Sequence, residues 1–495
     1  MDGLIAGPDD APAIRAPNRE PVSYAALKAQ AALTGRVLRG AGIGPEDRVA
    51  IVLPNGPAMA GAFACMAPWC AVAPLNPAYK EDEFDFYLSD LDASALVVAE
   101  GADSPAVTVA ARRGLRIFRL REESRAGAFS LSADAEAPAE TRGDDATALV
   151  LHTSGTTSRP KMVPLTQANL RASARNIART LSLSSADTCL NVMPLFHIHG
   201  LMAPVLASLS SGASVCCTPG FDGLRFFAWL EAAAPTWYSA VPTMHQAILA
   251  RAPRNRERIE RAALRFIRSS SASLPPPVMT ALEETFGAPV IEAYAMTEAA
   301  HQMCSNPLPP APRKAGFVGP AAGPEVAVMD ADGVALEAGT EGEIVIRGAN
   351  VMAGYLANPE ANAQAFFGDW FRTGDQGYMD GDGYVKVTGR LKEIINRGGE
   401  KIAPLEVDEV LLDHPAVAEA CTFAMPHRRL GEDVAAVVVQ AEGHAVEADA
   451  LRAFAAMRLA DFKVPRTIVF VDVIPKGATG KIQRIGLASA LGLGE

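Results

Sequence analysis

The sequence predicts an α/β protein with more than one domain. The chain has 495 residues, which is long for a single hydrophobic core. Up to about residue 320, short apolar segments alternate with helix-like segments, the pattern of a parallel sheet covered by helices. Later segments are short strands with Asp-Gly turns, followed by a compact α+β tail. We expect a domain boundary between Arg390 and Lys392.

Residues 49–79 contain no charged side chain and are long enough to cross a bilayer. Prolines interrupt this segment at five positions, namely Pro54, Pro57, Pro68, Pro74 and Pro77. Prolines at this density break the hydrogen bonding of a helix repeatedly. We therefore expect a buried strand, a core helix of small residues and a second strand, and no membrane association.

Residues 95–100 and 147–152 are short apolar runs typical of buried strands. The polar, Ala- and Pro-rich residues 121–145 lie between them, and we expect a surface excursion there. Thr166 is a good N-cap, and residues 167–183 after it predict a helix.

Farther along the chain, strand-like and helix-like segments continue to alternate. Strands are expected at residues 189–195 and 213–219, and helices at 224–233 and 242–252. Residues 324–336, 342–348 and 377–390 predict a small antiparallel unit. The C-terminal α+β tail is expected to contain helices at 404–417 and about 448–459 and strands at 419–425, 433–440 and 466–474.

The segment "LVLHTSGTTSRPKMVPL" at 149–165 leads from an apolar strand into hydroxyls, one glycine and Lys161. Hydroxyls, backbone N–H groups and an ammonium suit a polyphosphate, whose oxygens only accept hydrogen bonds. The spacing differs from the usual nucleotide loop, because Gly155 stands alone and Pro160 precedes the lysine. The segment therefore predicts a phosphate-binding loop of another type.

The composition excludes several classes of function. A net charge of −11, spread along the chain, argues against a nucleic-acid partner. Seven cysteines without C-x-x-C spacing indicate a reducing compartment without structural disulfides or a zinc site. The N-terminal residues lack a signal-peptide apolar core, and the C-terminal residues are not a peroxisomal signal. We expect a cytoplasmic protein.

Five segments in a fixed order carry a family resemblance. They are "HTSGTTSRPK" at 152–161, "YAMTEAAH" at 294–301, "WFRTGD" at 370–375, "GRLKEIINRGGEKI" at 389–402 and "GATGKIQR" at 477–484. Together they resemble the adenylate-forming superfamily, in its acyl-CoA synthetase branch, over nearly the whole chain. Within that branch, "PLFHIHGL", "RFIRSSSASL" and "EAYAMTEAAH" are most similar to oxalate–CoA ligases.

The resemblance implies two domains. Residues 1–390 would form a large N-terminal AMP-binding domain of α/β subdomains with a small β-barrel. Residues 391–495 would form a small, mobile α+β domain that rotates about a hinge near Lys392. The implied substrates are ATP, coenzyme A and a small carboxylic acid, with Mg²⁺ as the metal.

The resemblance also implies an ATP site. Lys161 and the hydroxyl run would hold the β- and γ-phosphates, with Thr153, Ser154, Gly155, Thr156 and Thr157 as the cradle. Ser158 replaces the glycine that is usual in the family. The adenine would be lined by Ala272, Ser273, Glu292, Ala293 and Tyr294, with the tyrosine ring as its stacking platform.

Further positions complete the predicted nucleotide site. Thr297 would contact the α-phosphate, and Glu298 would hold Mg²⁺, which prefers oxygen ligands. Asp375 would accept hydrogen bonds from both ribose hydroxyls, and Arg390 would support the same sugar. Lys392 matches the hinge position of the family.

Two glycines and one lysine of the C-terminal part have implied roles. Gly398 and Gly399 would let the pantetheine of coenzyme A pass close to the backbone. Lys481 matches the lysine that reaches the substrate carboxylate and the α-phosphate during adenylation. A positive group delivered only in a closed state would stabilise charge where it develops.

The expected acyl pocket is polar. A fatty-acid enzyme would use apolar and small residues there, whereas this chain has His197, Ser271 and His301. If a helix starts at Thr297, His301 lies one turn later on its face. Two imidazoles, one of them protonated, and a hydroxyl could hold the second carboxylate of a short diacid. His197 is a gate beside the carboxylate in many relatives, and His199 is expected only to pack.

We therefore predict an ATP-dependent acid–CoA ligase that acts through an acyl-adenylate. Oxalate is the first substrate to consider, and malonate or another short acid is the alternative. Two other classes of protein remain open. One is an adenylating enzyme that loads a carrier protein, and the other is a silent nucleotide-binding protein, against which the intact charged positions argue.

Overall fold

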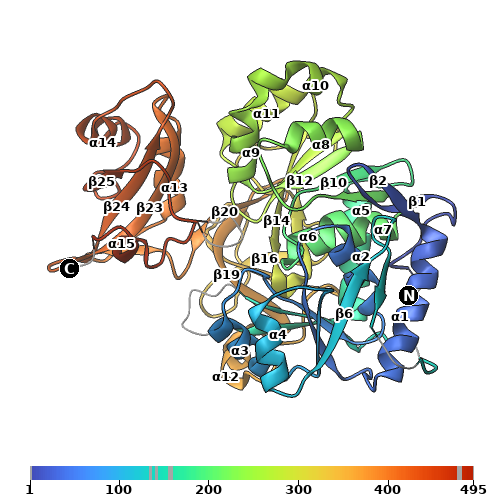
Figure 1. Cartoon of the computed structure of the whole chain (residues 1–495). Coiled ribbons are helices and arrows are strands. Elements are labelled where there is room, and N and C mark those ends of the chain that lie inside the picture. The colour runs from blue at the N-terminus through green and yellow to red at the C-terminus, as the bar shows by residue number, and fades with distance from the viewer. Residues whose placement is uncertain (1–2, 133–135, 140–142, 154–159, 477–481, 494–495) are drawn as a thin grey trace.

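Two large sheets packed with helices make up the N-terminal part of the computed structural model (Figure 1). The structure describes residues 3–132, 136–139, 143–153, 160–476 and 482–493. A smaller antiparallel sheet follows in sequence, and a fourth sheet with its own helices lies to one side of the rest. The predicted fold class, mixed α/β with a large N-terminal and a small C-terminal part, is confirmed.

The first sheet has seven strands in the order β7-β6-β5-β3-β4-β8-β9. Its five central strands run parallel, and β7 and β9 are antiparallel edges. The strands are β3 Arg48–Val52, β4 Ala71–Pro74, β5 Ala95–Ala99, β6 Arg116–Glu122, β7 Phe129–Leu131, β8 Thr147–His152 and β9 Met162–Thr166. Its helices are α1 Tyr24–Gly40, α2 Pro57–Met66, α3 Glu81–Asp90 and α4 Pro105–Arg112.

The uncharged residues 49–79 form β3, α2 and β4, as predicted. Apart from Pro54, every side chain from Val49 to Asn76 is buried or half-buried, and α2 is buried from Ala58 to Met66. In the part of the chain that the structure describes, no helix combines the length and apolar character needed to cross a bilayer. The apolar segment is therefore a core element.

The prediction of a surface excursion at residues 121–145 is wrong in part. Residues 129–131 form β7, which pairs antiparallel with the end of β6. Phe129 and Ala126 are buried against the core. The sequence signal was weak because this strand has only three residues and polar neighbours on both sides.

The second sheet has eight strands in the order β15-β14-β13-β12-β10-β11-β1-β2. Strands from β14 to β1 run parallel, while β15 and β2 are antiparallel edges. The strands are β1 Pro12–Ala16, β2 Arg19–Ser23, β10 Thr188–Asn191, β11 Ser214–Cys217, β12 Trp237–Ala240, β13 Phe266–Ser270, β14 Val290–Met296 and β15 His301–Ser305.

Helices on both sides of this sheet connect its strands. They are α5 Gln167–Thr180, α6 Ile198–Gly200, the π-helix Leu201–Leu206, α7 Ala207–Ser210, α8 Phe226–Ala233, α9 Pro242–Leu249, the 3₁₀ turn Ala252–Asn255, α10 Arg256–Arg261, α11 Pro276–Phe286 and the 3₁₀ turn Thr297–Ala299. The predicted start of α5 is confirmed. The Thr166 hydroxyl accepts from the Asn169 N–H at 3.1 Å, and the Asn169 side chain accepts from the Thr166 N–H at 2.9 Å.

Residues 325–390 form the small antiparallel unit that the Asp-Gly turns predicted. Its strands are β16 Glu325–Met329, β17 Gly342–Arg347, β18 Phe366–Phe367, β19 Trp370–Met379 and β20 Val385–Arg390, with α12 Pro359–Gln364 beside them. The C-terminal sheet comprises β21 Ile395–Arg397, β22 Glu400–Ile402, β23 Val417–His427, β24 Gly431–Gln440 and β25 Thr467–Phe470. Its helices are α13 Pro404–Leu412, α14 Ala448–Ala456 and α15 Leu487–Ala490.

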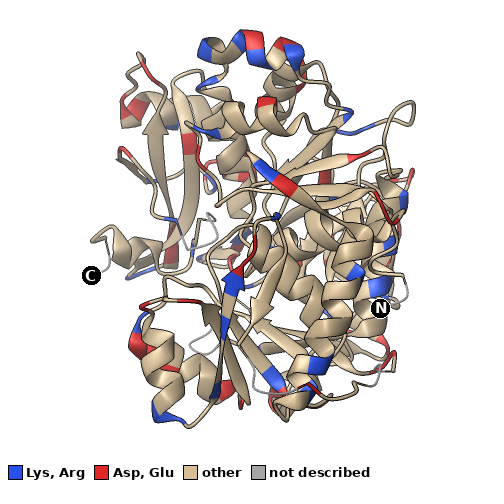
Figure 2. Cartoon of the chain, turned by 45° about the vertical axis from the view of Figure 1, so that its right-hand side comes forward, with Lys and Arg blue, Asp and Glu red and all other residues tan. Residues whose placement is uncertain are grey.

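Acidic and basic residues alternate over the outer helices and strands in the view of Figure 2. The pattern is clearest on α10, where arginines and glutamates follow one another. No broad basic face appears in that view, in line with the net charge of −11. Buried acidic residues, by contrast, occur inside the protein on β14 and β19, at Glu292 and Asp375.

Candidate active site

Thr153 and Lys161 face each other across the neck of the predicted phosphate loop. Thr153 follows β8, and Lys161 precedes the antiparallel strand β9. The Thr153 N–H donates to the Lys161 carbonyl at 2.9 Å, and the Lys161 N–H donates to the Thr153 hydroxyl at 3.2 Å. The other predicted cradle residues lie outside the described residues, as does the substituted loop position: Ser154, Gly155, Thr156, Thr157 and Ser158.

The ammonium of Lys161 lies over the ring of Tyr355, 4.3 Å from its centroid. The hydroxyl of the same tyrosine donates to the buried carboxylate of Glu298 at 2.9 Å. Burial lowers the pKa of Lys161, the positive charge of Lys392 lowers it further, and Glu298 opposes this. The structure thus groups Lys161, Glu298 and Lys392, and adds Tyr355, which the sequence analysis did not single out.

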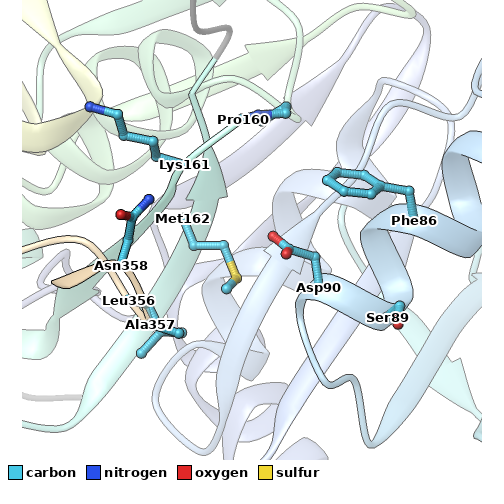
Figure 3. A pocket seen from close by; sticks show the side chains of 9 residues that line it. All are labelled: Phe86, Ser89, Asp90, Pro160, Lys161, Met162, Leu356, Ala357 and Asn358. Atoms are coloured by element: carbon cyan, nitrogen blue, oxygen red, sulfur yellow. The ribbon is translucent and has the colours of Figure 1, made fainter. Parts of the chain in front are cut away.

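A cavity of about 490 Å³ lies beside the backbone of Lys161 (Figure 3). It is lined by Phe86, Ser89, Asp90, Pro160, Lys161, Met162, Leu356, Ala357 and Asn358. In Figure 3 the ammonium of Lys161 points away from Phe86 and Asp90. None of the residues predicted for adenine, ribose or the acyl group lines this cavity, so it is separate from those parts of the site.

Tyr294, Asp375 and Arg390 form one connected group. The Tyr294 hydroxyl donates to the carboxylate of Asp375, which is buried. The other oxygen of that carboxylate pairs with the Arg390 guanidinium at 3.1 Å, because Asp375 and Arg390 are register partners on β19 and β20. Asp375 in turn raises the pKa of Arg390. The predicted stacking ring and the two predicted ribose residues are therefore brought together.

Glu292 lies two residues before Tyr294 on β14. Its carboxyl is buried and accepts a hydrogen bond from the Leu274 N–H at 2.8 Å. Burial raises the pKa of Glu292 to about 8, so this side chain is mostly neutral at pH 7. Leu274 directly follows the predicted adenine residues Ala272 and Ser273, which are exposed in the loop after β13. Glu292 therefore ties this loop to β14, next to Ala293.

The expected helix from Thr297 to His301 is wrong. Residues 297–299 form a single 3₁₀ turn, and the chain then reverses so that β15 starts at His301 and pairs with Met296. The reversal uses positive φ angles of 46° at Ala300 and 100° at His301. His301 is therefore placed by a strand reversal, and the apolar-polar pattern alone could not indicate this.

His301 nevertheless reaches the predicted substrate group. It is fully buried, and its ring stacks on that of His199 with centroids 4.8 Å apart. His199 Nδ1 lies 3.1 Å from the Ser271 hydroxyl, and the His197 ring nitrogen accepts from the His199 N–H at 3.3 Å. His199 was expected only to pack, but it connects all three predicted substrate residues.

Only one member of the serine run 269–271 takes part in this group. Ser269 and Ser270 are fully buried in β13, and the Ser270 hydroxyl donates to the Ala293 carbonyl at 2.8 Å. Ser271 lies just beyond the strand with φ of +77°. This turn brings its hydroxyl within hydrogen-bond distance of His199. The sequence analysis also missed Arg268, which contacts His199 from behind.

Three of the predicted site residues of the C-terminal part lie shortly after β20. Lys392 follows β20, and Gly398 and Gly399 form the turn between β21 and β22 with φ of +61° and +105°. A side chain at Gly398 would meet Leu430, whereas the position above Gly399 is open. Lys481 lies outside the described residues. In the described parts of the chain, no group of three or more His, Cys, Asp or Glu residues forms a metal site.

Comparisons with known proteins match this arrangement. Residues 5–356 match the model of the AMP-binding enzyme family, and residues 406–481 match the AMP-binding enzyme C-terminal domain. The chain belongs to the AMP-binding enzyme family. An oxalate–CoA ligase of Arabidopsis thaliana is 45% identical, with 91% of this chain and 89% of that protein covered.

Other members of this AMP-binding family extend the comparison. A sulfoacetate–CoA ligase of Cupriavidus necator is 38% identical over 94% of this chain and 92% of its own. The crystal structure of ATP-bound MatB from Rhodopseudomonas palustris superposes with a TM-score of 0.90 over 99% of both chains, at 29% identity. This AMP-binding enzyme is accordingly an AMP-forming acid–CoA ligase, with ATP, coenzyme A and a small acid as its substrates.

Proposed function

We propose that this ligase converts oxalate, ATP and coenzyme A to oxalyl-CoA, AMP and diphosphate. The observation that carries the proposal is the buried polar group formed by Ser271, His199 and His301. A pocket for an aliphatic acid gains affinity from apolar walls, whereas this one presents imidazole and hydroxyl groups. The oxalate–CoA ligase named above supports the same substrate.

In the first step, a carboxylate oxygen of oxalate attacks the α-phosphorus of ATP. The bond from that phosphorus to the bridging oxygen breaks, and diphosphate leaves with the electron pair. Tyr294 would stack on the adenine, and Asp375 would accept hydrogen bonds from the ribose hydroxyls. Lys161, which already lies near Glu298, would neutralise phosphate charge as the two anions approach.

Mg²⁺ fits the residues beside Lys161. Glu298 offers a buried carboxylate whose pKa is raised by burial, and nearby Arg390 and Lys161 counteract that effect. This carboxylate accepts from the Tyr355 hydroxyl and from the backbone N–H of Glu298 itself, and its two oxygens retain further lone pairs for a hard cation. Glu298 would hold the metal, whose chemistry is to screen the charge of the triphosphate. Thr297, adjacent to it, would contact the α-phosphate.

In the second step, the thiolate of coenzyme A attacks the acyl carbon of oxalyl-adenylate, and AMP leaves. We infer that residues 391–495 rotate about Lys392 between the steps, exchanging Lys481 for the turn at Gly398 and Gly399. The open space above Gly399 leaves room for a pantetheine chain close to the backbone. His197, half-buried at the start of α6, would stand next to the reacting carboxylate.

A panel of short acids tests the proposal. Purified protein with ATP, Mg²⁺ and coenzyme A should form a thioester fastest with oxalate, compared with malonate, sulfoacetate, acetate and a longer fatty acid. A site with buried polar groups rejects a partner that leaves them unpaired by orders of magnitude in kcat/KM. A clear preference for any other acid would contradict the substrate assignment and leave the ligase assignment intact.

Sulfoacetate is the second candidate, supported by the similar sulfoacetate–CoA ligase. Its sulfonate would take the place of the second carboxylate near Ser271 and His301.

Coenzyme A also has to be the acceptor in these assays, because an enzyme that loads a carrier protein would release AMP only with that carrier. AMP release that depends on free coenzyme A separates the two classes.

A further inference from the structure

Arg268 is a fully buried arginine in the middle of a sheet. It lies on β13, where it is the register partner of Ser239 on β12 and Ile291 on β14. One terminal nitrogen lies 3.4 Å from both His199 Nε2 and the Ser239 hydroxyl, and the other lies 3.3 Å from the Gln302 side-chain oxygen. Its Nε has no hydrogen-bond partner among the described residues.

These neighbours do not neutralise the charge of Arg268. No ion pair with a carboxylate is found for it in the described ranges, and the groups it contacts are a hydroxyl, an amide and an imidazole. Burial lowers the pKa of Arg268 to about 9, which still leaves the guanidinium charged at pH 7. A buried cation without a counter-charge is costly unless an anion joins it.

The contacts of His199 determine which of its two ring nitrogens carries the proton of the neutral imidazole. A guanidinium can only donate hydrogen bonds, so His199 Nε2 accepts from Arg268, and the Ser239 hydroxyl 2.6 Å away can donate to the same nitrogen. The proton of the neutral imidazole is then on Nδ1, which donates to the Ser271 hydroxyl at 3.1 Å. The hydrogen of Ser271 is left to donate to an anionic oxygen in the pocket.

We propose that Arg268 is the positioning residue that makes this pocket selective for short acids with a second anionic group. It holds His199 as a donor to Ser271 and supplies the positive charge behind the pocket. This inference rests on the proposed function and extends it, because it names the class of substrate as dianions. It also replaces the earlier expectation that one imidazole has to be protonated.

The surroundings contain few other titrating groups. The imidazole of His301 stacks on His199, and the thiol of Cys189 faces Arg268 with a pKa raised well above its ordinary value by burial. The ring of His245 lies near the Arg268 backbone, and burial lowers its pKa to about 3. With a fixed guanidinium as the source of charge, preference for a dianion should not change between pH 6 and 8.

The experiment compares kcat/KM for oxalate and acetate in the parent, Arg268→Met and Arg268→Lys. In the parent the oxalate-to-acetate ratio should be large and vary less than about threefold between pH 6 and 8. Arg268→Met should lower the ratio at least about a hundredfold while acetate activity persists, and Arg268→Lys should restore part of it. Arg265→Met is the matched control, since Arg265 is exposed and pairs with Asp187 at 2.8 Å.

Several results would overturn the inference. One is an Arg268→Met variant that keeps the oxalate preference of the parent. Another is a parent ratio that falls steeply as pH rises through 6 to 7, which would identify an imidazolium as the charge. That measurement needs no variant and so holds even if Arg268→Met does not fold. If the parent prefers sulfoacetate to oxalate, and Arg268→Met loses the preference for sulfoacetate over acetate, the oxalate assignment fails and the role of Arg268 stands.

Discussion

His301 combines full burial, a φ of +100° and a ring stacked on His199. A non-glycine residue in this backbone region is uncommon, and such positions gather at binding sites. We predict that His301→Ala costs about 2–4 kcal/mol of transition-state stabilisation with oxalate, a range typical of losing a hydrogen bond to a charged group, here the substrate carboxylate. In kcat/KM this is roughly a 30- to 1,000-fold loss. The KM for ATP should change little.

His245→Ala provides the control for His301→Ala. His245 is also fully buried, but it contacts Tyr238 at 3.3 Å on the opposite face of the sheet. Its loss should lower thermal stability and leave the ratio of oxalate to acetate turnover unchanged. An unchanged oxalate kcat/KM in His301→Ala would show that this imidazole has no part in recognising the acid.

Lys481 is assigned a role in only one of the two half-reactions. We predict that Lys481→Ala abolishes formation of the acyl-adenylate, measured as oxalate-dependent pyrophosphate exchange. Thioester formation from supplied oxalyl-adenylate should be largely retained, because the lysine would leave the site before that step. Lys476→Ala is the control, since Lys476 is held by Glu419 at 2.9 Å and has no assigned role. Equal loss of both half-reactions would contradict the assignment.

The motifs in the sequence named several residues that the structure brings together, while the roles assigned to these residues stay predictions. Tyr294, Asp375 and Arg390 are separated by up to 96 positions in the chain and still form one hydrogen-bonded group. Arg268 was missed, and His199 was expected only to pack, because their contacts join β13, α6 and β15, which lie far apart in the sequence. An arginine directly after the apolar pair Phe266 and Ile267, in a segment of strand type, was a sequence signal that could have pointed to Arg268.

At the scale of elements, the end of β20 lies next to the proposed boundary between the large and small domains. Asp375 and Arg390 close the β19–β20 ladder, and Lys392 follows two residues later. We predict that Lys392→Pro permits adenylation and blocks thioester formation, because proline fixes φ at a position where the hinge has to change it. The two half-reactions are measured separately, as pyrophosphate exchange and as oxalyl-CoA formation.

Lys392→Ala separates the backbone effect from the charge. The alanine variant removes the ammonium that lowers the pKa of Lys161 but leaves φ free to change. It should retain thioester formation at a reduced rate. Normal overall turnover in Lys392→Pro would place the hinge elsewhere, and equal defects in both variants would assign the role of this residue to its charge.

Elements were predicted best where local signals agree. The start of α5 was correct because a capping residue precedes an amphipathic run, and the capping box is present. The helix expected at Thr297 was wrong because a reversal at positive φ depends on contacts with β14 that sequence spacing does not show. The short strand β7 was missed for a similar reason, since its only signal is the pairing with β6.

At the scale of the whole molecule, alternation of strands and helices predicted the α/β class but not the order of strands. The eight-stranded sheet joins β1, near the N-terminus, to β11, about 200 residues later. Such strand pairing is determined by the burial of both faces of the sheet and by the crossover connections between its strands. A local pattern of apolar and polar residues contains neither kind of information. The proposed role of the active site depends on this order, because it brings β12, β13, β14 and β15 side by side.

The buried carboxyl of Glu292 should make the stability of the molecule depend on pH. Its pKa is raised to about 8 in the folded chain, against 4.5 as its ordinary value, so the folded state holds a proton that unfolding releases. Stability should therefore fall as pH rises from about 4.5 to 8, by up to about 1.4 kcal/mol per pH unit from this group.

Glu292→Gln keeps an oxygen for the Leu274 N–H and cannot ionise, so its melting temperature should exceed that of the parent at pH 8.5 and approach it at pH 5. Glu283→Gln is the control, because Glu283 pairs with Arg313 at 2.8 Å and is only partly buried. Parallel melting curves for parent and Glu292→Gln across this range would show that Glu292 is ionised in the folded protein, and that its charge has a partner beyond the Leu274 N–H.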